Sequence, residues 1–171
     1  MTSASVLFVC MGNICRSPAG EGVLQALVDA CGLSARVRVD SAGTIGYHEG
    51  KPADARMRAA AARRGYDLRS GARRIRREDL HAFDLVIAMD RENYSDVERL
   101  DPRPSAELRL LSDFLVGPLA IAPKGGRAGG WPEDVPDPYY GGAAGFDFVL
   151  DMIEAACPAI LARLRAGFEQ Q

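Results

Sequence analysis

A short apolar run that leads through a tight loop into a helix start constrains the fold of this 171-residue chain more than any other feature. Residues 5–10 read Ser-Val-Leu-Phe-Val-Cys, which is typical of a buried strand. Ser17 and Pro18 are a favoured N-cap and a favoured first helical residue. Apolar residues then recur on one helical face until Gly32, where the helix is expected to stop. The chain therefore begins with a strand, a tight loop and a helix.

The same alternation continues to the end of the chain. The predicted strands are residues 35–39, 84–89 and 107–111. Helices are predicted over residues 54–64 and 146–164. A further helix is predicted after Asp90, which would cap it, with Leu100 facing the core. Strands that alternate with helices predict a parallel sheet covered on both faces, that is, a three-layer α/β fold. A length of 171 residues fits one domain over residues 1–171.

Composition and charge exclude several classes of function. The net charge of −2 does not favour a general nucleic-acid binder. No apolar stretch is long enough to span a membrane, and the N-terminus lacks the pattern of a signal peptide, so a cytoplasmic protein is expected. The four cysteines form no zinc-type cluster with histidine. The sequence therefore predicts no metal, no cofactor, no nucleic-acid partner and no membrane partner.

The loop after the first strand carries the chemistry. Five residues separate Cys10 from Arg16, and the loop lacks both the GK[ST] of a nucleotide-binding loop and the dinucleotide GxGxxG. Backbone N–H groups at a helix N-terminus can surround an anion, and a guanidinium fits two phosphate oxygens. The same field lowers the pKa of a thiol, which predicts a Cys10 thiolate placed for attack on phosphorus. The predicted phosphate-binding residues are Met11, Gly12, Asn13, Ile14, Cys15, Arg16 and Ser17.

A cysteine nucleophile needs an acid to protonate the leaving oxygen, and Asp137-Pro138-Tyr139-Tyr140-Gly141 offers one. Proline fixes the backbone next to the carboxylate, and the two tyrosines supply apolar walls with polar tips. A plain Asp-Pro turn is the alternative interpretation. The sequence therefore predicts Cys10, Arg16 and Asp137 as the catalytic residues.

Taken together, these motifs resemble the low-molecular-weight protein tyrosine phosphatases. The resemblance spans nearly the whole chain and rests on CMGNICRSP at residues 10–18, DSAG at residues 40–43, FDLVIAMD at residues 83–90 and DPYYG at residues 137–141. It implies a flavodoxin-like fold with four parallel strands and no metal. It also implies hydrolysis of phosphotyrosine monoesters through a phosphocysteine intermediate. The implied partners are tyrosine-phosphorylated proteins and a cognate tyrosine kinase.

The resemblance also suggests roles around the loop. Tyr47, Tyr139 and Tyr140 would form the walls of the substrate cleft. Cys15 matches the second thiol of the family loop and would form a reversible disulfide with Cys10 under peroxide, which predicts redox regulation. The alternative for Cys15 is a small packed residue. The chain also departs from the family, because many members have a histidine near the position of Ser70.

Three further features leave alternatives open. The loop over residues 115–136 is either a lid that shapes substrate choice or a tolerated insertion. A basic run over residues 69–77 is either a solvated face or an attractor of acidic phosphopeptides. Cys31 and Cys157 are expected to be core thiols. This argues against the rival activity of an arsenate reductase, which needs further cysteines near the loop.

Two other rivals share the loop. A phosphoarginine phosphatase tends to have a threonine at the position of Ile14, so the isoleucine favours phosphotyrosine. A non-catalytic phosphate-binding module would need neither a thiol nor an acid, and the presence of Cys10 and Asp137 argues against it.

Overall fold

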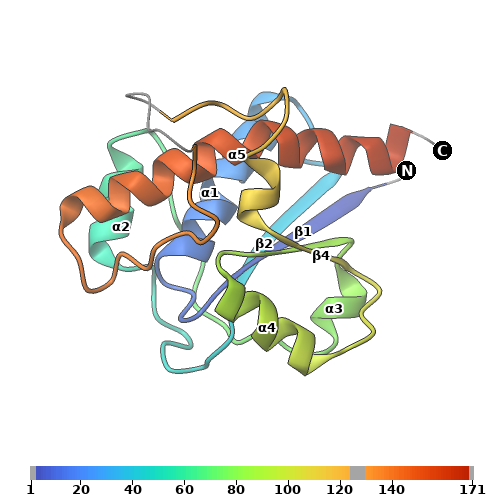
Figure 1. The fold of residues 1–171 in the computed structure, drawn as a ribbon, viewed down its shortest axis with the longest axis horizontal. Helices are drawn as coiled ribbons and strands as arrows, with labels where there is room; N and C mark the ends of the chain where they lie inside the picture. The colour runs from blue at the N-terminus through green and yellow to red at the C-terminus, as the bar shows by residue number, and fades with distance from the viewer. Residues whose placement is uncertain (1–2, 124–129, 170–171) are drawn as a thin grey trace.

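The structure, a computed structural model, describes residues 3–123 and 130–169. Its sheet contains four parallel strands in the order β2-β1-β3-β4 (Figure 1). The strands are β1 (Ala4–Cys10), β2 (Val37–Gly43), β3 (Leu85–Ala88) and β4 (Glu107–Leu110). The four-stranded parallel sheet predicted from the sequence is confirmed.

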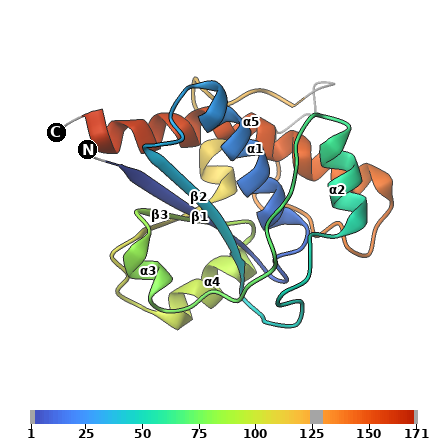
Figure 2. The same cartoon turned by 180° about the vertical axis from the view of Figure 1, so that it is seen from behind.

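Helices cover both faces of this sheet, as expected for a three-layer fold. They are α1 (Arg16–Ala30), α2 (Ala55–Ala62), α3 (Asp79–Ala82), α4 (Arg91–Leu100) and α5 (Ala143–Glu169), with a 3₁₀ turn at Leu111–Phe114. Helices α1 and α5 lie on one face with α2 beside them, and the short α3 and α4 lie on the other (Figures 1 and 2). Each face of the sheet therefore has its own hydrophobic cluster.

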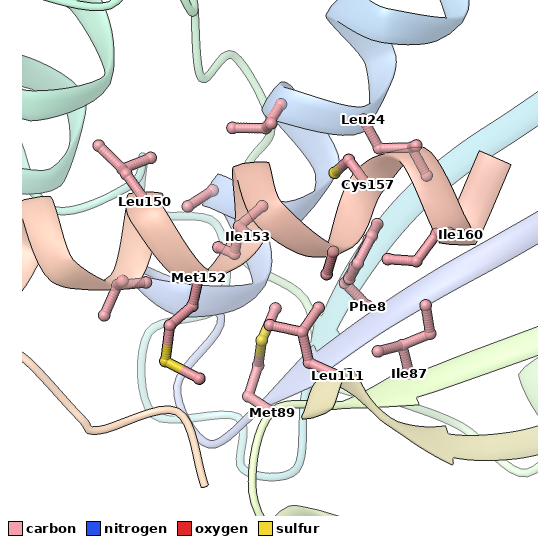
Figure 3. Close-up of a cluster of buried hydrophobic side chains, with 14 of the residues drawn as sticks. Phe8, Leu24, Ile87, Met89, Leu111, Leu150, Met152, Ile153, Cys157 and Ile160 are labelled. Carbon is pink, nitrogen blue, oxygen red and sulfur yellow. The ribbon is translucent and has the colours of Figure 1, made fainter. Parts of the chain in front are cut away.

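The alternation of side chains along β1 divides the core between the two faces. Phe8 belongs to the cluster under α1 and α5, whereas Leu7 and Val9 belong to the cluster under α3 and α4. In Figure 3, Phe8 and Ile87 project from the sheet toward α5. Because β1 is buried on both faces, its sequence is a continuous apolar run rather than an alternating one.

The second strand was placed too early by the sequence pattern. It begins at Val37 and continues through Asp40 and Ser41 to Gly43, in register with β1 from Ala4 to Cys10. Its polar half does not resemble a buried strand in the sequence. The polar side chains can lie in the sheet because distant elements supply their hydrogen-bond and ion-pair partners. Asp40 forms an ion pair with Arg73, and the Ser41 hydroxyl is hydrogen-bonded to both Asn13 and Glu21.

Two other details differ from the predictions. Leu100 is exposed at the end of α4, where the helical pattern placed it inward, and Val97 is the buried apolar residue of that helix. Cys31 is exposed at the C-terminal end of α1, whereas Cys157 is buried in α5 as predicted. The predicted N-cap at Asp90 is confirmed, since its Oδ1 accepts a hydrogen bond from the backbone N–H of Asn93 at 2.7 Å.

Candidate active site

The loop from Cys10 to Arg16 lies at the carboxyl end of β1, between the end of that strand and the start of α1. Strand β1 has β2 on one side and β3 on the other, so the strand order reverses its direction across the sheet at β1. Such a switch point is where open α/β sheets place their ligands.

A cleft of about 330 Å³ opens over this loop. The predicted site residues on its walls come from three segments: Cys10 to Arg16, Tyr47, and Asp137 to Tyr140. They are Cys10, Met11, Gly12, Ile14, Cys15, Arg16, Tyr47, Asp137, Tyr139 and Tyr140. Asn13 and Ser17 do not line the cleft, because both are buried beneath the loop.

Hydrogen bonds beneath the loop hold its shape. The Ser17 hydroxyl lies 2.9 Å from the Cys10 Sγ, and Asn13 Nδ2 donates to the same hydroxyl at 2.8 Å. Asn13 has a φ of 56°, a left-handed conformation that asparagine tolerates better than most residues. The predicted N-cap at Ser17 is wrong. Helix α1 begins at Arg16, its N-cap residue is Cys15 with no side-chain cap hydrogen bond, and the Ser17 hydroxyl lies against the thiol instead.

The guanidinium of Arg16 is buried and held from two sides. Its Nη1 donates to Asp90 Oδ2 at 2.5 Å and to the backbone carbonyl of Val135 at 3.0 Å, and its Nη2 lies 3.6 Å from Asp137 Oδ2. Burial alone would lower the pKa of Arg16. The negative charges of Cys10, Asp90 and Asp137 outweigh burial and raise it. Arg16 is therefore a fixed cation in the floor of the cleft.

Asp90 has a second function that the sequence did not reveal. One carboxylate oxygen caps α4, and the other binds Arg16. From the sequence, Asp90 was predicted only as the N-cap of the next helix. The available signal was position, because Asp90 follows a buried strand whose carboxyl end lies at the same edge of the sheet as the loop.

The segment that carries Asp137 is anchored to the same edge. The backbone N–H of Val135 donates to the carbonyl of Met89 at 2.9 Å, and the carbonyl of Val135 accepts from Arg16. Asp137 Oδ1 accepts from the N–H of Tyr139 at 3.1 Å. The Asp137 side chain stays 41% exposed, so it can contact a substrate that enters the cleft.

Aromatic rings surround the mouth of the cleft. Tyr47 and Tyr140 are 78% and 90% exposed, and Tyr139 contacts Tyr140 edge to face with 4.9 Å between ring centroids. His48 lies between the two walls, with its ring centroid 4.8 Å from that of Tyr47 and 6.2 Å from that of Tyr139. His48 was not among the predicted catalytic or cleft residues, although its place next to Tyr47 in the chain already indicates a position at the border of the cleft.

The cysteines differ sharply in their surroundings. Cys15 lies in the cleft wall, and burial, with the nearby charges of Asp54 and Cys10, raises the pKa of its thiol to about 12. Burial also raises the pKa of Cys157. Neither Cys31 nor Cys157 lines the cleft, so within the described residues only Cys10 and Cys15 could take part in its chemistry.

The long loop before Asp137 contributes little to the cleft walls. Of residues 115–123 and 130–136, none lines the cleft, and Val116, Leu119 and Ile121 are exposed. Residues 124–129 of this loop lie outside the described residues, so the lid remains a hypothesis. The basic run is mixed, because Arg69, Arg74, Arg76 and Arg77 are exposed whereas Arg73 is half-buried between Asp40 and Asp79.

Residues 3–123 and 130–169 contain no group of three or more histidine, cysteine or acidic side chains that could hold a metal ion. In the same part of the chain, no helix has both the length and the apolar character needed to cross a membrane.

The sequence matches one protein family over nearly its whole length. Residues 5–170 match the model of the family described as low molecular weight phosphotyrosine protein phosphatase. A low molecular weight protein-tyrosine-phosphatase of Streptomyces coelicolor is 44% identical over 166 residues, which cover 96% of this chain and 95% of that protein.

Solved structures agree with the sequence match. A protein tyrosine phosphatase from Entamoeba histolytica, with Hepes in its active site, has a TM-score of 0.84 and 38% identity, covering 96% of this chain and 99% of its own. A Drosophila arginine phosphatase has a TM-score of 0.78 and 31% identity, covering 92% of this chain and 96% of its own.

Proposed function

Because the chain belongs to the low molecular weight phosphotyrosine protein phosphatase family, we propose that it hydrolyses phosphotyrosine monoesters through a phosphocysteine on Cys10. One observation carries the proposal. A thiol and a buried guanidinium from one loop meet an accessible carboxylate from a distant segment of the chain in a single cleft. Binding alone would require only the guanidinium and the backbone N–H groups of the loop.

In the first step, the loop and Arg16 hold the phosphoryl oxygens, and the Cys10 thiolate attacks phosphorus in line. The S–P bond forms as the bond between phosphorus and the phenolic oxygen breaks. Asp137 gives its proton to the departing phenolate. Arg16 stabilises the charge that develops on the three equatorial oxygens.

In the second step, Asp137 acts as a base and takes a proton from water. The water oxygen attacks phosphorus, the S–P bond breaks, and inorganic phosphate leaves with Cys10 restored as a thiolate. The exposed rings of Tyr47 and Tyr139 provide flat apolar surfaces on both sides of the cleft for the phenyl ring of the substrate.

The proposal extends to the setting of the enzyme. Its substrates would be tyrosine-phosphorylated proteins, and the kinase that produces them would be its functional partner. We also propose that residues 1–171 act as one phosphatase domain in the cytoplasm, without a cofactor. The family match over residues 5–170 supports the single domain.

A panel of matched phosphopeptides tests the activity. One neighbouring structure is that of an arginine phosphatase, so the panel compares phosphotyrosine, phosphoserine and phosphoarginine in the same peptide, with and without EDTA. We expect phosphotyrosine to be the best substrate, because its ring reaches between the cleft walls, and EDTA to have no effect. Faster release of phosphate from phosphoarginine would contradict the proposed specificity, and inactivity on all three would leave phosphate binding as the function.

We further propose that peroxide regulates the enzyme through Cys10 and Cys15. Peroxide would oxidise the Cys10 thiolate to a sulfenic acid with release of hydroxide, and Cys15 would then form a disulfide with it, releasing water. The raised pKa of Cys15 makes the second step slow at neutral pH, because the attacking species is the thiolate.

Cys15→Ser tests the regulation. We expect wild-type activity to return fully with dithiothreitol after peroxide treatment, and the variant to lose most of its recoverable activity by overoxidation. Disulfide formation, followed by mass spectrometry, should become faster as pH rises toward the pKa of Cys15. Equal recovery in both proteins would show that Cys15 does not protect Cys10, and Cys31→Ser serves as the control for an exposed thiol.

A further inference from the structure

A continuous path of hydrogen bonds leads from Glu21 on α1 to the thiol in the cleft. The Ser41 hydroxyl donates to Glu21 Oε2 at 2.5 Å, and Asn13 Nδ2 donates to Ser41 Oγ at 2.9 Å. The same Nδ2 donates to Ser17 Oγ at 2.8 Å, and Ser17 Oγ lies 2.9 Å from Cys10 Sγ. Glu21 itself does not line the cleft, and nothing in the proposed chemistry uses it.

The chemistry of the groups fixes the direction of this path. When Glu21 is ionised, its carboxylate only accepts hydrogen bonds, so the single hydroxyl proton of Ser41 then points to Glu21. Ser41 Oγ is then left as an acceptor for one of the two protons on Asn13 Nδ2. The backbone N–H of Arg73 donates to Asn13 Oδ1 at 3.0 Å, which fixes the orientation of the amide.

The last step concerns the hydroxyl of Ser17. Its oxygen accepts the second proton of Asn13 Nδ2, and its own proton has two candidate acceptors. Cys10 Sγ is 2.9 Å away and the carbonyl of Ala42 is 3.3 Å away. With the amide of Asn13 held in place, the closer sulfur, which is the attacking thiolate in the proposed function, is the favoured acceptor.

We propose that Glu21 is a positioning residue that acts through Ser41 and Asn13 to direct the Ser17 hydroxyl at the Cys10 thiolate. The inference rests on the proposed function for its effect on turnover, but not for its effect on the thiol itself. The alternative is that Glu21 only stabilises the packing of α1 against β2.

The surroundings of Glu21 argue against that alternative. Burial raises the pKa of Glu21, so the fold disfavours its charged form, and Asp40 acts in the same direction. Hydrogen bonds from Ser41 and Ser70 and the charge of Arg73 oppose this effect, although Arg73 is also paired with Asp40 and Asp79. A half-buried acid at this position is costly for packing alone, where an apolar side chain of similar length would serve.

Glu21→Met removes the acceptor and keeps the length of the side chain, and Glu21→Gln keeps an acceptor oxygen. Ser41→Ala removes the middle of the path. We expect Glu21→Met and Ser41→Ala each to lower kcat for para-nitrophenyl phosphate by about tenfold with little change in KM, the scale of one hydrogen bond to a charged group. Glu21→Gln should keep most of the wild-type kcat. The double variant that combines Glu21→Met with Ser41→Ala should be no slower than the slower of the two single variants.

Alkylation of Cys10 by iodoacetamide across pH separates this inference from the proposed function, because it requires no turnover. In Glu21→Met and Ser41→Ala the midpoint of alkylation should move to higher pH, since the thiolate has lost a donor. Asp29 lies on the same helix, and its carboxylate accepts hydrogen bonds from Gln25 and Ser34, so Asp29→Asn should leave the midpoint unchanged. An unmoved midpoint in folded Glu21→Met, or additive effects in the double variant, would overturn the inference even if the enzyme is an active phosphatase. If the wild type has no phosphatase activity, a shifted midpoint would still support it.

Discussion

Cys10→Ser should reduce turnover of aryl phosphates by about 10⁴-fold or more while phosphate binding persists. The substitution replaces the sulfur by an oxygen that stays protonated at neutral pH, so the attacking species is lost. Arg16 remains buried in the cleft floor with its partners Asp90 and Val135 unchanged, so the anion site survives. Steady-state kinetics gives the first quantity, and calorimetric titration with inorganic phosphate gives the second.

Cys31→Ser is the matched control, because its thiol is exposed and lies outside the cleft. Its kinetic constants should equal those of the wild type. If Cys10→Ser kept more than about a hundredth of the activity, an intermediate on sulfur would be ruled out as the main route.

Asp137→Asn should slow hydrolysis of phenyl phosphate and phosphotyrosine by about 10²- to 10³-fold, the range of general acid catalysis. An asparagine cannot give a proton to the departing oxygen. For 2,4-dinitrophenyl phosphate, whose phenolate leaves without protonation, the loss in the first step should be far smaller. The dependence of kcat/KM on leaving-group basicity should therefore become steeper in the variant than in the wild type.

Glu133→Gln is the control for this measurement. Glu133 is an exposed acid four residues earlier, it pairs with Arg91 at the surface, and it does not line the cleft. An equal loss for all leaving groups in Asp137→Asn would mean that Asp137 holds the loop or the substrate rather than transferring a proton.

The sequence predicted the parts of this molecule that depend on local pattern. Buried strands such as β1 and β3 are continuous apolar runs, and the loop between β1 and α1 contains its own turn and helix-start signals. Cys10 and Arg16 were found because both lie in that loop. Asp137 was found because its neighbours Pro138 and Tyr139 form a recognisable motif.

The parts that the sequence did not reveal depend on contacts between distant segments. The register of β1 with β2 places Ser41 within reach of both Asn13 and Glu21, and no spacing in the sequence indicates this. The link from Asp90 to Arg16 requires β3 to lie beside β1. The backbone carbonyl of Val135 could not be predicted as a partner, because any residue type supplies the same carbonyl.

The two carboxylates around Arg16 have a consequence for product release. Asp90 binds the guanidinium closely, whereas Asp137 lies 3.6 Å away and is partly exposed. Because Asp137 belongs to the same chain, its local concentration near Arg16 is high and constant. In the proposed reaction, Asp137 would therefore compete with the inorganic phosphate that is bound after the second step. The carboxyl group proposed to give the proton in the first step would then also favour release of the product.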